Sequence, residues 1–243
     1  MLELQTKNLE KHFQGVRAVD GLSITIATGK LTSIIGPNGS GKTTLTNIVS
    51  GVCAFDSGQV VIGGQELSRV RPYEIKNFGL SRTFQNVRLF EQMTVLDNIL
   101  VVLTERNVWS SLFERHGVYH LDRAEAVLTR VGLWSKRDAL ASGLSYGQRK
   151  LLEIARVLAM DAKIILFDEP FAGLFKEMSK QVVEILLELK QAGKTIVLIE
   201  HNMELIRQLS DHLIVMDAGK LLAQGKPAEV LKRRDVIEAY LGE

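Results

Sequence analysis

The sequence predicts an α/β fold in which helices cover the faces of a parallel or mixed sheet. In the first and last thirds of the chain, apolar strand-like runs alternate with helical segments, which is the pattern of a parallel sheet. Between them lies a stretch with helical periodicity only, and a glycine-rich turn joins one apolar strand to a helix. We therefore expect a single domain over residues 1–243, with a core formed by 1–86 and 151–243 and a helical subdomain at 87–150.

Strand-like segments dominate the first third. Alternation of apolar and polar residues predicts half-buried strands at Glu3–Leu9 and Leu22–Ala27. The compact apolar run Leu31–Ile35 predicts a buried strand that ends in a turn, and helical periodicity follows from Lys42 to Val49. After a second turn at residues 56–58, two more strands are expected, at Gln59–Ile62 and Leu80–Phe84.

The middle of the chain reads as helices. Thr94 and Asp97 are expected to form a capping pair for a helix at Val95–Leu103. A second amphipathic helix is expected at Asp122–Val131 and a third at Gly147–Met160. The apolar stripe of this third helix consists of Leu151, Leu152, Ile154, Ala155 and Leu158.

Strands and helices alternate again in the last third. Short apolar runs predict buried strands at Lys163–Phe167 and Thr195–Ile199, each followed by a helix, at Glu177–Leu189 and Met203–Ser210. A two-stranded ribbon, Leu213–Met216 and Lys220–Ala223, is expected to turn at Ala218 and Gly219.

The composition is that of an ordinary soluble globular protein. Apolar residues make up 46% of the chain and charged residues 24%, which excludes a disordered chain, a collagen-like repeat and a disulfide scaffold. Thirty Lys and Arg residues against 28 Asp and Glu give a net charge of +2. Because coating a phosphate backbone needs a strong basic excess, we expect no nucleic acid as partner.

Several absences point to the cytoplasm. The lone cysteine, Cys53, suits a reducing compartment because it cannot form an internal disulfide. No run approaches the roughly 20 apolar residues that cross a bilayer, and the first residues do not read as a signal peptide. The sequence therefore predicts a cytoplasmic protein that works at a membrane only as a peripheral partner.

The sharpest motif is a phosphate-binding loop. Its residues fit the pattern G-x-x-x-x-G-K-[ST] and are Gly36, Pro37, Asn38, Gly39, Ser40, Gly41, Lys42 and Thr43. Glycines let backbone N–H groups turn inward around phosphate oxygens, and the following helix presents its positive end to the same anion. We expect Lys42 to reach the β- and γ-phosphates and Thr43 to bind Mg²⁺, with Thr44 in the same nucleotide site.

Two carboxylates follow the buried strand at residues 163–167. Asp168 and Glu169 emerge at its C-terminal end, where parallel sheets place their active sites. Asp168 is expected to hold Mg²⁺, directly or through water, and Glu169 to act as general base on an attacking water. Taken alone, the pair could also be two strand-end carboxylates in solvent, but the phosphate loop favours the catalytic interpretation.

Three further elements complete a recognisable set. The segment Leu144-Ser145-Tyr146-Gly147-Gln148 opens a predicted helix, Gln85 follows a strand, and His201 follows the strand at 195–199. In this order along the chain, and over essentially its whole length, the motifs resemble the ATPase subunit of ATP-binding cassette (ABC) transporters. The resemblance implies a nucleotide-binding core with an N-terminal antiparallel β subdomain and an inserted α-helical subdomain.

The resemblance also implies a site shared between two subunits. ATP would lie between the phosphate loop of one cassette and the residues Ser145, Gly147 and Gln148 of a second ATPase subunit, identical or different. Gln85 would sense the metal and the attacking water, and His201 would bind the γ-phosphate and orient Glu169. Phe13 matches the aromatic residue that stacks on adenine. Each has a simpler alternative: Ser145 as a plain helix cap, His201 as a surface residue and Phe13 as a core aromatic.

The family resemblance further implies the partners and location. Two integral-membrane permease subunits and an extracytoplasmic substrate-binding protein would complete the transporter, with this chain peripheral on the inner face of the cell membrane. Apolar residues after Gln85, namely Leu89, Phe90 and Met93, would line the groove for a helix of the permease or pack within the lobe.

The details narrow the branch. Residues 82–90 and 93–98, the segment 169–174 and the ending Ala239-Tyr240-Leu241-Gly242 closely resemble the importer subunit for branched-chain amino acids. Tyr146, where the family usually has Gly, is typical of that branch. Relatives for urea or amide import and for lipopolysaccharide export have similar endings and stay open as alternatives. A non-transport cassette of DNA repair or translation is disfavoured, because such proteins usually carry coiled-coil or zinc insertions or a second cassette.

One departure from the family pattern concerns the loop after Glu169. Phe175 stands where the family usually has Asp and this branch often has Asn. A polar group that would bond across the dimer is therefore missing. We hypothesise that the ATP site served by this loop is weaker or regulatory, with a partner cassette carrying the more active one.

Overall fold

The computed structural model describes residues 2–83, 87–103 and 117–241. These residues cluster into two compact units. The first unit comprises Met1–Arg82, Lys163–Glu169 and Val183–Glu243, and the second comprises Thr83–Ala162 and Pro170–Val182. The predicted subdomain limits at residues 87 and 150 stay a prediction.

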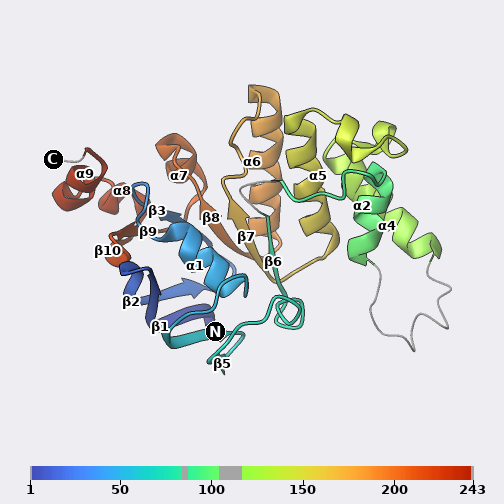
Figure 1. Cartoon of the computed structure of the whole chain (residues 1–243). Helices are drawn as coiled ribbons and strands as arrows, with labels where there is room; N and C mark the ends of the chain where they lie inside the picture. The colour runs from blue at the N-terminus through green and yellow to red at the C-terminus, as the bar shows by residue number, and fades with distance from the viewer. Residues whose placement is uncertain (1, 84–86, 104–116, 242–243) are drawn as a thin grey trace. The chain divides into compact units, whose positions relative to one another are not determined.

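The first unit contains an antiparallel sheet built from the N-terminal part of the chain (Figure 1). Its strands follow the spatial order β2-β1-β4-β5 and comprise β1 (Leu2–Phe13), β2 (Val16–Ala27), β4 (Ser57–Ile62) and β5 (Gln65–Leu67). Gln14 and Gly15 both have positive φ, as a tight hairpin turn between β1 and β2 requires. This sheet confirms the antiparallel N-terminal subdomain that the family resemblance implies.

A six-stranded sheet carries the phosphate loop. Its spatial order is β10-β9-β3-β8-β7-β6, and its strands are β3 (Leu31–Ile35), β6 (Leu80–Arg82), β7 (Ile164–Asp168), β8 (Thr195–Ile199), β9 (His212–Asp217) and β10 (Lys220–Gly225). All neighbours pair in parallel except β9 and β10, so the sheet is mixed. Every residue of β3, β7 and β8 is buried, because both faces of this sheet are covered.

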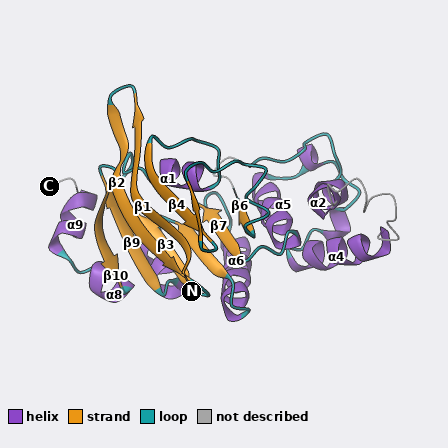
Figure 2. Cartoon of the chain, turned by 90° about the horizontal axis from the view of Figure 1, so that it is seen from below, coloured by secondary structure: helices purple, strands orange, loops and turns teal. Residues whose placement is uncertain are grey.

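The two faces of the six-stranded sheet at β3 and β9 belong to different apolar cores. On one face, Ile34 and Ile214 pack in a cluster with Leu45 and Ile48 of helix α1 (Lys42–Val49) and with residues of the antiparallel sheet. On the other face, the next residues along the strands, Ile35 and Val215, pack with the helices at the end of the chain. These helices are α7 (Met203–Leu209), α8 (Pro227–Val230) and α9 (Arg234–Leu241). Figure 2 shows α8 and α9 beside β10.

The second unit is helical. It contains α2 (Val95–Leu103), α4 (Gly117–Arg130), α5 (Tyr146–Ala159) and two short 3₁₀ turns, Trp134–Lys136 and Ala141–Gly143. The three α-helices contact one another pairwise, and their buried residues include Ile99, Leu128, Leu152 and Ala155. Helix α6 (Lys176–Gln191) begins in this unit and ends in the first.

The boundaries differ from the prediction at several elements. β1 extends beyond Leu9 to Phe13, and β2 begins before Leu22, at Val16. Pairing in the hairpin keeps these added residues in strands although their sequence does not alternate between apolar and polar residues. The strand expected at residues 80–84 ends at Arg82, with residue 84 outside the described part of the chain. Helix α4 begins at Gly117, five residues before the expected start. The short strand β5 and the helices α8 and α9 were not predicted.

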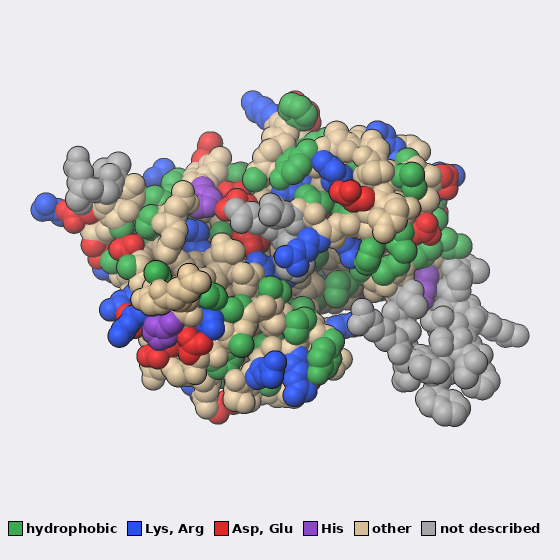
Figure 3. Space-filling model, viewed as in Figure 1, with side chains coloured by type: hydrophobic (Ala, Val, Ile, Leu, Met, Phe, Trp, Pro, Cys, Tyr) green, Lys and Arg blue, Asp and Glu red, His purple; other side chains and the backbone are tan. Residues whose placement is uncertain are grey.

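Among the residues described, every helix is too short or too polar to span a bilayer. On the face that Figure 3 shows, outside its grey atoms, Lys and Arg side chains are interspersed with Asp and Glu side chains. That distribution accords with the near-neutral net charge of +2.

Candidate nucleotide site

The phosphate loop turns between β3 and α1 in a conformation that only glycine adopts easily. Gly36, Gly39 and Gly41 have φ values of 157°, 83° and 98°. A Cβ atom on Gly36 would lie 2.1 Å from the carbonyl oxygen of Met216, and one on Gly41 would lie 2.2 Å from that of Ala18. The loop is therefore held closely between β2 and β9, and two of its glycines are required by sterics as well as by φ.

Lys42 is buried within the curve of this loop, with 6% of its surface exposed. Its Nζ donates hydrogen bonds to the carbonyl oxygens of Gly36 at 2.8 Å and Pro37 at 2.9 Å. Burial lowers the pKa of the Lys42 ammonium, although attraction to the carboxylates of Glu169 and Asp168 works in the opposite direction. The cation is thus already placed at the centre of the cradle that the loop forms.

The remaining loop residues present polar groups at the N-terminus of α1. Thr43 and the loop residues Asn38 and Gly39 are exposed, whereas Ser40 is buried. Gly219, in the turn between β9 and β10, donates its N–H to the carbonyl oxygen of Ser40 at 3.2 Å. The exposed Thr43 lies in the first turn of α1, and the positive N-terminal end of a helix is a favourable place for an anion and its metal ion.

Asp168 ends β7 as a buried carboxylate. Its Oδ2 accepts a hydrogen bond from the guanidinium of Arg82 at 2.7 Å, and the two side chains are 2% and 3% exposed. Sequence reasoning missed Arg82. The available signal in the sequence was a charged residue inside a predicted strand. In the structure, the neighbours of Arg82 along the chain, Ser81 and Thr83, are both buried.

Glu169 and His201 meet at the ends of adjacent parallel strands. Nε2 of His201 lies 3.1 Å from Oε1 of Glu169. Glu169 adopts a positive φ of 49°, and its N–H donates to the carbonyl oxygen of Ile199 at 3.0 Å. This unusual backbone conformation turns the carboxylate away from the buried strand and toward His201.

Glu200, between strand β8 and His201, is a second residue that the prediction missed. It is buried, and its Oε2 accepts the backbone N–H of His201 at 2.7 Å and of Asn202 at 3.4 Å. Burial raises the pKa of the Glu200 carboxyl, and these two hydrogen bonds only partly oppose the rise. Asn202 then caps helix α7 by accepting the N–H groups of Glu204 and Leu205.

In the second unit, the segment 144–148 forms a reciprocal cap at the start of α5. The N–H of Gln148 donates to Oγ of Ser145 at 3.3 Å, and the N–H of Ser145 donates to Oε1 of Gln148 at 3.1 Å. Gly147 is buried, and a Cβ atom there would lie 2.6 Å from Sδ of Met178. The cap that the simpler alternative expected is therefore present, and Ser145 is exposed beside the N-terminus of α5.

Two aromatic residues that the sequence analysis singled out, Phe13 and Phe175, are exposed. Phe13 is the last residue of β1 and is 47% exposed, with Nζ of Lys11 5.1 Å from its ring centroid. It is not a core aromatic, so that alternative is wrong. Phe175 is 75% exposed. Gln85 lies outside the described residues.

Comparison with known proteins decides the family. The sequence profile of the ABC transporter family matches residues 19–172, which is more than half of the chain. The chain belongs to the ABC transporter family. A second profile, that of the branched-chain amino acid ATP-binding cassette transporter, matches residues 220–243.

Curated relatives align with this ABC cassette over nearly its whole length. It is 38% identical to the probable branched-chain amino acid transport ATP-binding protein LivG of Archaeoglobus fulgidus, over 98% of this chain and 95% of that protein. It is also 38% identical to the high-affinity branched-chain amino acid transport ATP-binding protein LivG of Escherichia coli K12, over 99% and 98%. The predicted family is confirmed, and with it the ATPase class of the subunit.

Solved cassettes share its fold. A nucleotide-free ATP-binding cassette from an ABC transporter superposes with a TM-score of 0.86, at 36% identity and full coverage of both chains. The ADP conformation of an ATP-binding cassette of an ABC transporter gives the same TM-score, identity and coverage. The predicted α/β fold class is thereby confirmed, and nucleotide binding follows from the family. A dimeric bacterial ABC transporter cassette is similar at a TM-score of 0.82 and 26% identity, over 92% of this chain and 98% of that one.

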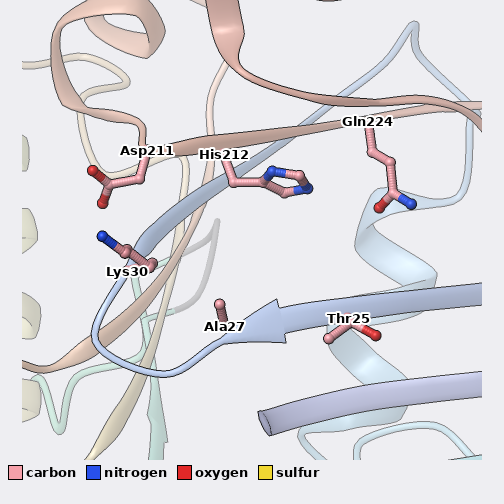
Figure 4. A pocket seen from close by; sticks show the side chains of 6 residues that line it. All are labelled: Thr25, Ala27, Lys30, Asp211, His212 and Gln224. Carbon is pink, nitrogen blue, oxygen red and sulfur yellow. The ribbon is translucent and has the colours of Figure 1, made fainter. Parts of the chain in front are cut away.

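A separate hollow of about 590 Å³ lies at the N-terminal ends of β3 and β9, whereas the phosphate loop follows the C-terminal end of β3. Figure 4 shows the side chains of Lys30 and Asp211 at one end, with His212 between them and Gln224. Asp211 is already engaged: Lys190 lies 2.7 Å from its Oδ1, and Leu31 donates its N–H to Oδ2 at 3.0 Å. Burial favours a higher pKa for Asp211, but these partners lower it overall. Among the described residues that line the hollow, none is a predicted site residue.

Proposed function

We propose that this ABC cassette binds and hydrolyses ATP to drive an importer of branched-chain amino acids. The observation that carries the chemistry is the contact between Glu169 and His201 in the same unit as the phosphate loop. The substrate class rests on the profile that matches residues 220–243 and on the names of the full-length relatives. That C-terminal match favours branched-chain amino acids over urea, amides and lipopolysaccharide.

In this proposal, the first unit binds the nucleotide of its own subunit. Phe13 stacks on adenine through its exposed ring, and backbone N–H groups of the phosphate loop, other than at Pro37, surround the phosphates. Lys42, now bonded to two loop carbonyls, exchanges these contacts for the β- and γ-phosphates, which a partly desolvated ammonium binds strongly. Thr44 belongs to the same nucleotide site.

The donor set also fits Mg²⁺. Thr43 supplies an exposed hydroxyl and Asp168 a carboxylate, both oxygen ligands of the kind that Mg²⁺ prefers. Among the described residues, no group of three or more His, Cys, Asp or Glu side chains is arranged to hold a metal ion. The proposed ligands are therefore Thr43 and Asp168 with Gln85, phosphate and water. Bound there, Mg²⁺ would neutralise charge that develops on the phosphates.

Hydrolysis requires a water positioned for attack and a group to take its proton. Glu169 is the proposed general base, since its carboxylate is turned out of the sheet at the strand end. His201 holds that carboxylate in place and binds the γ-phosphate. From a second cassette, Ser145, Gly147 and Gln148 would bind the same phosphate from the opposite side through the N-terminus of α5.

The partners follow from the same function. A second ATPase subunit, two integral-membrane permeases and an extracytoplasmic binding protein would complete the importer, with this chain peripheral on the inner face of the cell membrane. Phe90 in the second unit is 40% exposed, and the guanidinium of Arg156 lies 5.3 Å from its ring centroid. This pair would offer a permease helix a surface that is both apolar and cationic. Nucleic acid is not among the proposed partners.

The test is coexpression with its membrane subunits, copurification, and uptake of labelled leucine, isoleucine, valine and urea into vesicles that contain ATP inside and the binding protein outside. We expect copurification and ATP-dependent uptake of the three amino acids, and a complex with Glu169→Gln should assemble without uptake. Uptake of urea alone would contradict the substrate class. Recovery of the chain only with ribosomes or DNA would contradict the transport function.

A further inference from the structure

Arg82 joins three elements of the first unit through one buried guanidinium. One terminal nitrogen, Nη2, donates to Oδ2 of Asp168 on β7 at 2.7 Å. The other, Nη1, donates to Oδ1 of Asn47 and to Oγ of Ser50, each at 2.8 Å. Asn47 lies on helix α1 and Ser50 ends it, so strand β6 is tied at Arg82 to both neighbours.

The chain of hydrogen bonds continues along α1 to the phosphate loop. Oγ of Ser50 donates to the carbonyl oxygen of Thr46 at 2.6 Å, and Oγ1 of Thr46 donates to the carbonyl oxygen of Thr43 at 3.1 Å. The bonds thus run without interruption from the carboxylate of Asp168 to the backbone of Thr43. Both are residues that the proposed function assigns to Mg²⁺.

The chemistry of this connection calls for arginine. A carboxylate as buried as that of Asp168 is costly unless a cation and hydrogen bonds compensate it. The planar guanidinium offers donors in two directions at fixed geometry, whereas a lysine ammonium is a point charge on a flexible stem. Lysine at this position would keep the charge beside Asp168 but could not hold α1 and β7 in a fixed relation.

We infer that Arg82 is a positioning residue for the metal site, which it acts on through Asp168 and through α1. It fixes the spacing between the Asp168 carboxylate and the Thr43 hydroxyl, so that both are in place when the nucleotide arrives with Mg²⁺. The inference rests on the proposed function. It assigns Arg82 no contact with nucleotide.

Calorimetric titration with ADP, once with Mg²⁺ and once with EDTA, separates positioning of the metal from general damage. For the full-length chain we expect Mg²⁺ to tighten ADP binding. In Arg82→Lys this Mg²⁺-dependent gain should fall by about tenfold or more, as for other residues that orient metal ligands, while the Kd in EDTA stays within about twofold. Arg71→Lys is the matched control, because Arg71 is an exposed arginine bonded to Tyr73 and Glu74, and it should bind as the unmodified chain does.

A second variant guards against misfolding of Arg82→Lys. The double change Asn47→Ala with Ser50→Ala removes the α1 side of the connection and leaves the ion pair with Asp168, and we expect the same selective loss with Mg²⁺. An unchanged Mg²⁺-dependent gain in both variants would overturn the inference. Equal weakening with Mg²⁺ and with EDTA would overturn it too, since that is the signature of a structural role. Failure of the unmodified chain to bind ADP would instead contradict the proposed function on which the inference rests.

Discussion

The Nε2 atom of His201 lies 3.1 Å from Oε1 of Glu169, although the two residues are 32 positions apart in the sequence. Parallel pairing of β7 with β8 sets Asp168 opposite Ile199, so the residues that follow each strand emerge side by side at one edge of the sheet. The contact is thus a consequence of strand register. It fixes the orientation of the proposed base before substrate binds.

Loss of the His201 side chain should slow turnover and spare binding. In His201→Ala, the carboxylate of Glu169 loses its neighbour, and we expect kcat for ATP to fall on the order of a hundredfold because a misplaced catalytic group loses its alignment with the water. His201→Gln keeps a hydrogen-bond donor and should recover part of the rate. Steady-state kinetics with a parallel ADP titration checks this, and equal kcat values for all three proteins would contradict the role of His201.

The buried Glu200 predicts a specific pH dependence of stability. Its pKa is raised in the folded state, so the folded protein binds this proton more tightly than the unfolded chain does. The associated stability is fully present below the ordinary Glu pKa of about 4.5 and is lost as the pH rises through the folded-state value. Glu200→Gln still offers an oxygen to the N–H groups of His201 and Asn202 without carrying the charge.

Glu200→Gln should therefore be more stable than the unmodified chain at pH 8, with the difference shrinking toward pH 4. Urea unfolding at the two pH values gives the two free energies directly. Glu204→Gln changes an exposed carboxylate on α7 and serves as the control. A stabilisation of the same size at both pH values would mean that charge is not its cause.

The reciprocal cap at Ser145 should contribute measurably to stability. Ser145→Ala removes the hydroxyl that accepts the N–H of Gln148, and losing such a cap costs about 1 kcal/mol of unfolding free energy. Ser142→Ala is the matched control, an exposed serine in a 3₁₀ turn that caps no helix. Chemical denaturation of both variants checks the prediction, which a smaller effect of Ser145→Ala than of Ser142→Ala would refute.

Phe175 is the residue to change if the loop after Glu169 weakens one ATP site. The ring is 75% exposed and stands where the family usually has a polar side chain. Phe175→Asn restores an amide that could bond across the dimer, so we expect higher ATPase and transport rates in the assembled transporter. Phe175→Leu, which remains apolar, should not raise them. Unchanged rates with Asn would end the hypothesis of a weaker or regulatory site.

The parts of the site that depend on local sequence pattern could be predicted from the sequence. Residues 36–43 and the strand before Asp168 follow directly from glycine spacing and a short apolar run, and the structure has both elements where they were expected. Tertiary partners were less accessible. Arg82 could not be paired with Asp168 in advance, because their contact depends on β6 lying beside β7 across a separation of 86 residues.

Other misses have the same physical origin. Glu200 reads as a polar residue after a strand, and only the fold shows that it is buried and bonded to two backbone N–H groups. β5 spans three residues, too few for an alternation to be recognised, and it exists because β4 offers it an edge. Helix α8 has four residues and depends on its packing against β9 and β10.

The most direct test of the central claim is the ATPase rate of the purified chain, assembled with its membrane subunits, beside that of Glu169→Gln. With Mg²⁺ and ATP, the unmodified protein should hydrolyse ATP, and the variant should lose at least about a hundredfold in kcat while still binding nucleotide, as removal of a general base predicts. Equal turnover by the two proteins would contradict a hydrolytic site centred on Glu169.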